Sequence, residues 1–343
     1  MEVAIGVDSH KGSLAAAVVD EVGKLIEARE FPNHPKGHDA FRGWVRAQVT
    51  DRRIGVEGSL NYGAALTKRL LSCAEDVREV PASLTHAERR KRRSQGKSDL
   101  IDAVAIARVV AREEDLPSAR RTAQLSDLKL LVDYRDQLAR ARTQVANRAH
   151  ADLAAIRPGY ERSIPKLLTK GQLAKARRMV RGDHSLRAEL LRRRLTEIAR
   201  LDRSIAQAGE EIRTAVRRTG TTLTEIPGVG PLIAAKILGE VGEVSRIRSK
   251  AAFAVMSGTA PLLASSGQTN RHQLSRGGNR QLNRALHFVA FIQTRSTPEA
   301  KEYLARQRAA GKSPKESMRC LKRHLSNVVF RRLVADAGIE MAA

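Results

Sequence analysis

The sequence predicts an α/β fold at the N-terminus followed by a chain that is mostly α-helical to its end. Short apolar segments bounded by turn residues fill the first 80 residues and are typical of buried strands. From about residue 123 onward, apolar residues instead recur at helical spacing. With 343 residues, of which 42% are hydrophobic, the chain is long enough for two or three domains with their own cores.

The N-terminal part alternates strand and helix signals. Five apolar segments predict strands, and only turns separate the first three: 3–7, 13–19, 24–31, 53–57 and 77–80. Helical spacing predicts helices over 37–49 and 61–73, on either side of the fourth strand. A three-stranded meander followed by helix, strand, helix and strand is the order of an RNase H-like fold.

The remaining segments predict helices joined by loops. A helix begins at about Ser98, whose hydroxyl can cap it. Two long helices between 123 and 218 carry apolar stripes, which predict either an antiparallel coiled-coil arm or an ordinary helical bundle. Basic helices are expected near the C-terminus, after a loop rich in Gly and Ser over 258–279. We therefore expect three domains: 1–118, 119–218 and 219–343.

The charge of the chain indicates a polyanionic partner. Lys and Arg total 62 against 37 acidic residues, which gives a formal net charge of +25. Such an excess favours nucleic-acid binding driven by counterion release, although a ribosome-associated or merely basic protein has the same composition. Aromatic residues make up only 3%, so base stacking cannot be the main binding mode.

The sequence also bears on compartment. It has no stretch of about 20 apolar residues and no signal-peptide pattern, so we expect no membrane partner. The two cysteines, Cys73 and Cys320, are far apart, which argues against a disulfide framework or a thiolate zinc site. We expect a cytoplasmic protein.

Four carboxylates are the main candidates for chemistry. Asp8 follows the first strand and Glu57 ends the fourth, so adjacent central strands would bring them together. Asp99 and Asp102 are three residues apart at a helix start and share one face. Four clustered carboxylates repel one another unless divalent cations such as Mg²⁺ bind between them. Any one of these acids alone could be a surface residue or a helix cap.

A basic run precedes the acidic pair and either grips phosphates or is a solvated loop. Its members are Arg89, Arg90, Lys91, Arg92, Arg93 and Lys97.

The segment 226–230 resembles a helix-hairpin-helix turn. Gly228 and Gly230 would let backbone N–H groups approach a phosphate, with a helix N-terminus behind them. The alternative is a plain packing turn between helices.

Two adjacent hydroxyls, Ser265 and Ser266, lie in the Gly- and Ser-rich loop. Serines in loops usually form turns, but these are close in sequence to basic and polar residues that suit a phosphate: Arg271, His272, Arg276, Asn279 and Arg280.

Taken in order, these motifs resemble the DEDD transposases of insertion sequences, the family of bridge-RNA-guided recombinases. The resemblance covers nearly the whole chain. It lies in the segments 6–11, 56–57, 97–103, 226–230, 265–267 and 276–279, together with Gly258 and Pro261. Each motif alone is weak, whereas the ordered set is specific. The segment 275–279 departs from the family pattern because one basic position is lost or shifted.

The resemblance implies a RuvC-like, RNase H-fold domain, a coiled-coil arm and a C-terminal transposase domain. It further implies a nucleophilic serine that forms a covalent phosphoserine link with DNA. The family pattern selects Ser265, and Ser266 stays possible. Mg²⁺ at the acidic site, a noncoding guide RNA that pairs with donor and target DNA, and a dimer that assembles into a tetramer are implied as well, with the protein at the nucleoid.

Two other functions remain open from the residues alone. A metal-dependent RuvC-like nuclease or Holliday-junction resolvase would use the same four acids with water and form no covalent intermediate. A non-enzymatic nucleic-acid scaffold would explain the charge but not the clustered acids, which repel a polyanion.

Overall fold

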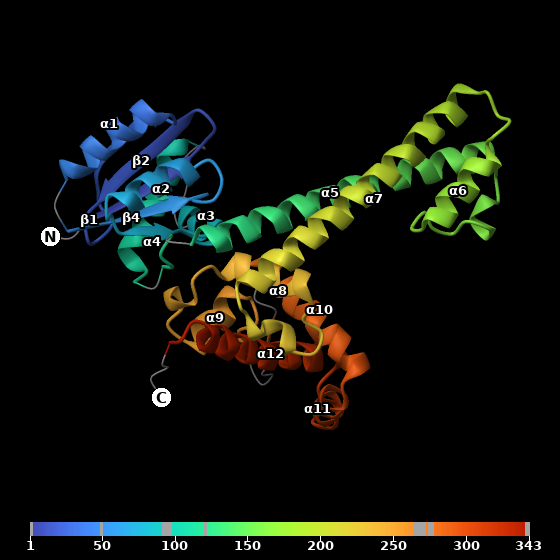
Figure 1. Cartoon of the computed structure of the whole chain (residues 1–343). Helices are drawn as coiled ribbons and strands as arrows, with labels where there is room; N and C mark the ends of the chain where they lie inside the picture. Colours follow the sequence, from blue (N-terminus) through green and yellow to red (C-terminus); the bar gives the residue numbers. More distant parts are fainter. Residues whose placement is uncertain are drawn as a thin grey trace. The chain divides into compact units, whose positions relative to one another are not determined.

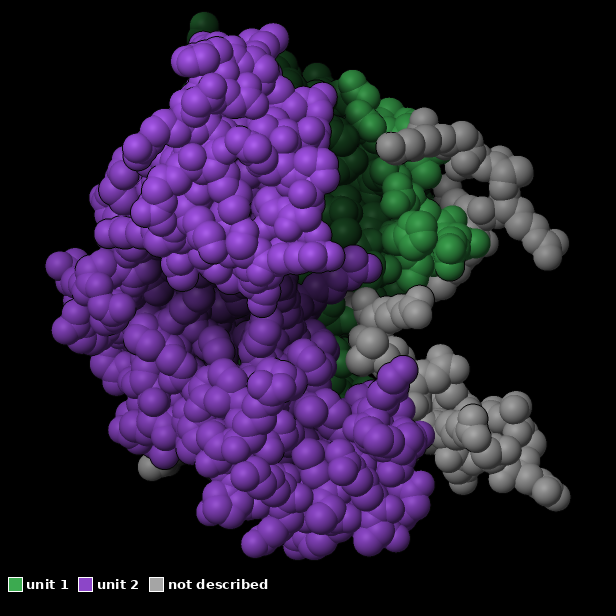
Figure 2. All heavy atoms as spheres, turned by 90° about the vertical axis from the view of Figure 1, so that its right-hand side faces the viewer, with its two compact units in different colours: residues 1–121, 245–278 green, residues 122–244, 279–343 purple. Residues whose placement is uncertain are grey.

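The structure, a computed structural model, describes residues 3–48, 51–90, 98–114, 116–119, 122–263, 272–273 and 278–339. The chain divides into two compact units, each built from two separate segments (Figure 2). Unit 1 contains residues 1–121 and 245–278, and unit 2 contains residues 122–244 and 279–343. The three predicted domain ranges stay a prediction.

A five-stranded sheet forms the centre of unit 1 (Figure 1). Its strands are β1 (Val3–Ser9), β2 (Ser13–Val19), β3 (Leu25–Pro32), β4 (Arg52–Glu57) and β5 (Val77–Glu79). The order across the sheet is β3-β2-β1-β4-β5. The first three strands pair antiparallel, whereas β4 runs parallel to both β1 and β5. This confirms the predicted meander and crossovers, and with them the RNase H-like fold.

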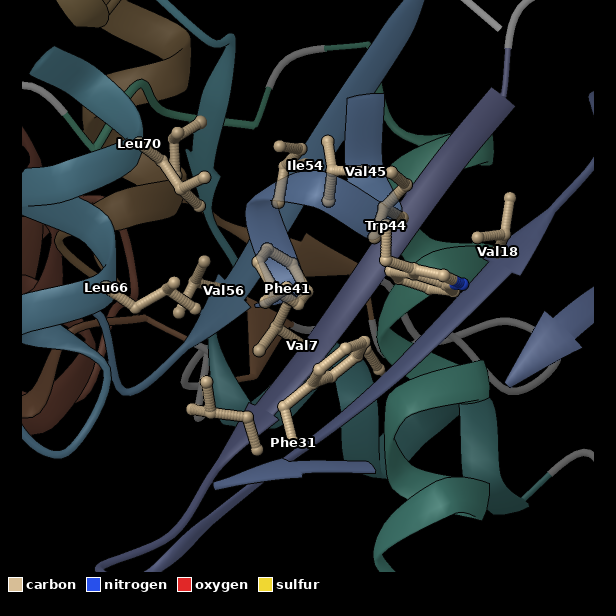
Figure 3. Packing of buried hydrophobic residues seen from close by; sticks show 14 of the residues in the cluster. Val7, Val18, Phe31, Phe41, Trp44, Val45, Ile54, Val56, Leu66 and Leu70 are labelled. Carbon is tan, nitrogen blue, oxygen red and sulfur yellow. The ribbon is translucent and has the colours of Figure 1, made fainter. Parts of the chain in front are cut away.

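One face of this sheet is covered by α1 (Pro35–Arg46) and α2 (Ala64–Ser72). Alternate residues of β1, β2 and β4 point to this face and pack against Phe41, Trp44 and Leu66 (Figure 3). The rings of Phe31, Phe41 and Trp44 lie 5.4–5.9 Å apart between centroids. The aromatic cluster therefore fixes α1 against the meander.

The opposite face is covered by α4 (Asp99–Arg112), which packs unusually close to the backbone of β1 and β4. Gly6 and Gly55 are register partners at this contact. A Cβ on Gly6 would lie 2.2 Å from the backbone nitrogen of Ala107, and one on Gly55 would lie 2.2 Å from a methyl group of Val110. Two glycines side by side thus make the flat surface that α4 needs.

A shorter helix, α3 (Ala82–Arg90), packs on α4 in the same unit. The sequence did not predict it, because Thr85 is the only residue of α3 that is fully buried and no apolar stripe results. The later segment of unit 1 contains α9 (Lys250–Met256) and the short strands β6 (Leu262–Leu263) and β7 (His272–Gln273), which were expected to be loop. The buried guanidinium of Arg246 donates a hydrogen bond to Glu79 at 2.9 Å and ties this segment to the sheet.

Unit 2 contains the predicted two-helix arm. Helices α5 (Ala123–Ile156) and α7 (Leu186–Arg218) lie side by side along their length (Figure 1). At one end, the chain between them folds back as η1 (Tyr160–Arg162) and α6 (Lys170–Met179) and packs in a core shared with the adjoining parts of α5 and α7. Near the other end lie η2 (Thr222–Glu225), α8 (Pro231–Val241), α10 (Arg280–Ser296), α11 (Pro298–Ala309) and α12 (Pro314–Asp336).

Two details differ from the sequence-based expectation. Ser98 holds the N-cap position of α4, but its side chain makes no capping hydrogen bond. Neither α6 nor α11 was predicted, because each buries only two residues and so shows no clear apolar stripe. In the part of the chain that the structure describes, no helix combines the length and the apolar character needed to cross a membrane.

Candidate active site

The predicted acids Asp8 and Glu57 lie next to each other on the sheet. They are direct register partners at the ends of the parallel strands β1 and β4. Val7 and Val56 belong to the core on the α1 face. Because successive side chains alternate across a strand, Asp8 and Glu57 point to the face that α4 covers.

The other two acids come from the first turn of α4. Asp99 and Asp102 are both in that turn, where the helix dipole favours negative charge. The close packing of α4 on Gly6 sets where this turn stands over the sheet. The Asp8 and Asp102 side chains are each 14% exposed, whereas that of Asp99 is 48% exposed, so the cluster opens to solvent on the Asp99 side.

His10 joins two of the acids and was not predicted as a site residue. Its Nε2 atom lies 3.1 Å from Asp8 Oδ2 and 3.4 Å from Asp99 Oδ1. Ligand atoms of these three residues all lie within 4.8 Å of one another, close enough to hold one metal ion. A signal was present in the sequence, since residues two apart in an extended segment share a face.

Burial and mutual repulsion raise the pKa of two of the acids. Burial is the main cause of the raised pKa of Asp8, and the charges of Asp102 and Asp99 add to it, while His10 opposes it. Burial likewise raises the pKa of Glu57, with contributions from the charges of Asp8 and Asp102. Burial and mutual repulsion therefore make the ionised form of these carboxylates energetically unfavourable. A cation bound between them would remove this penalty.

Arg89, the first member of the predicted basic run, lies against this cluster. Its Nη1 atom donates to both carboxylate oxygens of Asp102, each at 2.8 Å. Arg89 thus neutralises part of the acidic charge. Arg90, the last residue of α3, is exposed. The other members of the run, Lys91, Arg92, Arg93 and Lys97, lie outside the described residues.

The predicted hairpin in unit 2 has the expected backbone shape. Gly228 has φ +85°, a conformation that favours glycine, and Gly230 is the N-cap of α8 with no side-chain cap. Gln293 of α10 donates a hydrogen bond to the Pro227 carbonyl at 2.7 Å, which fixes the turn. At the start of α8, Pro231 has no N–H and the backbone N–H groups of Ile233 and Ala234 donate to the Gly230 carbonyl, so anion binding by this turn stays a prediction.

Asn279 has a structural task. Its side-chain oxygen accepts hydrogen bonds from the backbone of Gln281 and Leu282, and its amide donates to Glu240 at 2.6 Å. The neighbouring Arg280 is exposed. The serine candidates Ser265 and Ser266, together with Arg271 and Arg276, lie outside the described residues.

The donor set of the cluster fits a divalent cation. Carboxylate oxygens dominate it, as suits Mg²⁺ and Mn²⁺, and the imidazole of His10 widens the range toward transition metals. A divalent cation at such a site supplies charge neutralisation at a phosphate and activates an attacking oxygen. The register of β1 and β4 positions Asp8 and Glu57, and the first turn of α4 positions Asp99 and Asp102.

Comparison with known proteins places both halves of the chain among transposases. A family model for DEDD transposases of the IS110 type, described as "Transposase", matches residues 5–158. A second model, described as "Transposase IS116/IS110/IS902 family", matches residues 220–305. Together the two regions cover well over half of the chain.

Curated relatives match along most of their length. The chain is 28% identical to the "Insertion element IS110 uncharacterized 43.6 kDa protein" of Streptomyces coelicolor, over 99% of this chain and 98% of the relative. It is 25% identical to the IS900 42 kDa protein of Mycobacterium paratuberculosis, over 96% and 94%. It is 24% identical to the transposase for IS1111A of Coxiella burnetii, over 77% and 70%.

Among solved structures, RuvC of T. thermophilus in complex with a Holliday junction substrate is 16% identical, with a TM-score of 0.26 over 31% of this chain and 90% of RuvC. A score this low supports no conclusion about this chain.

The two family models and the curated relatives, in contrast, show the family. The chain belongs to the DEDD transposase family of IS110-type insertion elements, and it is an enzyme that cuts and recombines DNA.

Proposed function

We propose that Asp8, Glu57, Asp99 and Asp102 bind Mg²⁺ and form one half of the catalytic site of this transposase. The observation that carries the proposal is the register pairing of Asp8 with Glu57, beneath the first turn of α4 that contributes the other two acids. Each acid alone has an ordinary explanation. Their joint placement concentrates negative charge that Arg89 and His10 offset only in part, and a divalent cation bound between the four carboxylates would offset the rest.

The second half of the site is proposed to be a serine nucleophile, Ser265, with Ser266 as the other candidate. Support comes from the order of the motifs and from the family model that spans both residues. A bond forms between serine Oγ and phosphorus while a P–O bond of the DNA strand breaks. The serine proton passes to a base and the leaving oxygen takes up a proton. Attack by another strand's hydroxyl then releases the serine.

We also propose that a noncoding RNA from the element guides the choice of donor and target DNA, and that dimers assemble into a tetramer at the nucleoid. The family resemblance implies both features. The net charge of +25 is consistent with more than one nucleic-acid partner. Sequencing the RNA that copurifies with the protein from its host tests this part, and absence of RNA from the element would contradict it.

Trapping the covalent intermediate tests the catalytic proposal. With Mg²⁺ and a duplex that carries the element end, the native protein should form a protein–DNA adduct that mass spectrometry maps to residue 265. Ser265→Ala should abolish the adduct and strand joining, and Ser266→Ala serves as the matched variant. An adduct at residue 266 would transfer the role to Ser266. Mg²⁺-dependent cleavage without any adduct would instead show a hydrolytic RuvC-like nuclease.

A further inference from the structure

The turn between the two arm helices is strongly basic. This segment, residues 157–187, is called the arm tip and contains η1, α6 and the start of α7. It holds nine Lys and Arg residues against two acidic ones. None of the motifs above includes any of these residues.

The arm tip is a packed structure rather than a loose loop. Ile164, Leu173 and Val180 are buried in a core shared with Leu153 of α5 and Leu195 of α7. A capping box at Thr169 and Gln172 fixes the start of α6. The basic side chains are therefore displayed from a defined surface.

Within the described residues, none of the nine cations of the arm tip forms an ion pair with a carboxylate. Three of them donate hydrogen bonds to neutral oxygens of the protein: Arg157, Lys175 and Arg177. The other six are exposed: Arg162, Lys166, Lys170, Arg178, Arg181 and Arg187. Their charge is left to solvent or to a ligand.

Along the shaft of the arm, several cations have acidic partners. Arg142 pairs with Asp202, Arg194 with Asp152 and Arg200 with Glu197. Arg193 and Arg213 likewise have acidic partners one helical turn away. Carboxylates of α5 and α7 thus neutralise several cations of the shaft, whereas among the described residues no carboxylate forms an ion pair with a cation of the tip.

We propose that the arm tip is a second contact for duplex DNA and binds the phosphate backbone without reading sequence. Unpaired Lys and Arg side chains release counterions when they contact phosphates, and such contacts carry no base specificity. The only Phe, Tyr or Trp side chain of the tip is Tyr160, which is buried and hydrogen-bonded to His150, so the tip exposes none of these large rings for stacking with unpaired bases. Backbone binding to a duplex is the mode that remains.

The test measures binding of full-length protein to a fluorescent duplex of about 30 base pairs and arbitrary sequence, in EDTA so that the acidic cluster does no chemistry. The variant combines Lys166→Gln, Lys170→Gln, Arg178→Gln and Arg181→Gln. Its affinity should fall roughly tenfold to a hundredfold near physiological salt, and the slope of log affinity against log salt should decrease by about 3 to 4. In a separate assay with Mg²⁺ and a duplex that carries the element end, cleavage at saturating DNA should be unchanged, which separates this proposal from the catalytic one.

The matched control removes four cations that have acidic partners: Arg193→Gln, Arg200→Gln, Arg213→Gln and Arg217→Gln. It has the same net charge as the test variant and should keep most of the DNA affinity. If both variants lose the same DNA affinity, the loss is due to the change in net charge alone, and the proposal is overturned.

Two further outcomes would also overturn it. Loss of binding to an RNA duplex of the same length, with DNA binding retained, would make the tip an RNA contact. The tip also exposes Leu168 and Leu186, at 61% and 70%. If Leu168→Ser with Leu186→Ser removes DNA binding together with self-association, while the Gln variant retains both, the tip is an interface between copies of the chain.

Discussion

The charged side chains of the acidic cluster in unit 1 and of the arm tip in unit 2 differ in burial and in their partners. Asp8 and Asp102 are mostly buried, and His10 and Arg89 hold them by hydrogen bonds. The cations of the tip are exposed and have no acidic partner among the described residues. Buried charges are costly and need partners or a cation, whereas exposed ones cost little. A buried cluster suits chemistry on one phosphate, and an exposed surface suits binding of many.

The largest expected effect comes from a substitution of Asp8 in the acidic cluster. Asp8→Asn should lower Mg²⁺-dependent DNA cleavage by about 10³-fold or more, since a catalytic metal supplies several kcal/mol of transition-state stabilisation. Gel assays of strand cleavage measure the loss. Glu30→Gln, which changes an exposed acid on β3 of the same sheet, is the control and should cleave normally. Cleavage at the native rate by Asp8→Asn would remove this residue from the site.

The next largest effect is expected on stability, from a substitution of Gly6 where α4 packs on the sheet. Gly6→Val should destabilise unit 1 by about 3 kcal/mol, because even its Cβ would overlap the backbone of Ala107. Denaturant unfolding measures the loss, and cleavage should fall with it because α4 carries two of the acids. Gly12→Ala, at a glycine with open space around it, should change stability by less than about 0.5 kcal/mol. A stable Gly6→Val protein would show that α4 can shift without cost.

The raised pKa values predict a pH dependence for metal binding. A carboxyl group whose pKa is raised takes up a proton at a higher pH than an ordinary one, so protons compete with Mg²⁺ earlier as the pH falls. Affinity should decrease by up to about tenfold per pH unit for each of Asp8 and Glu57 once the pH is below its pKa. Calorimetric titration at stepwise lower pH tests this.

The smallest effect is expected at the capping box of α6. Thr169→Ala should cost about 1 kcal/mol, because it removes the hydroxyl that accepts the hydrogen bond from Gln172. Hydrogen exchange of α6 measures this locally. Thr143→Ala, in the middle of α5, removes a hydroxyl that caps nothing and should not destabilise the arm. Unchanged exchange in Thr169→Ala would show that the core of the tip alone holds α6.

The parts predictable from sequence are those with a local pattern. The meander, both arm helices and the strand-end position of Asp8 and Glu57 follow from apolar spacing and from the way parallel strands end together. The helix start at Asp99 was also found from its neighbours in sequence. Each of these features depends on a few consecutive residues or on simple sheet topology.

The features missed depend on contacts between distant residues. The flat surface made by Gly6 and Gly55 exists only because β1 and β4 pair in one register. The sequence left Arg89 in a run that either grips phosphates or is a solvated loop; its contact with Asp102, 13 residues later in the chain, depends on α3, which was not predicted. The excess of cations in the tip is visible in the sequence, with nine Lys and Arg against two acidic residues, but which cations have acidic partners depends on the fold.

The contact between Arg246 and Glu79 has a consequence for synthesis of the chain. The two residues are 167 positions apart, and nearly half of the chain is translated between them. At roughly 5–20 residues per second, on the order of ten seconds or more passes before Arg246 can reach the sheet. All four acids leave the ribosome well before that moment. The nascent enzyme therefore has time to assemble its acidic sheet edge before the later segment of unit 1 can join it.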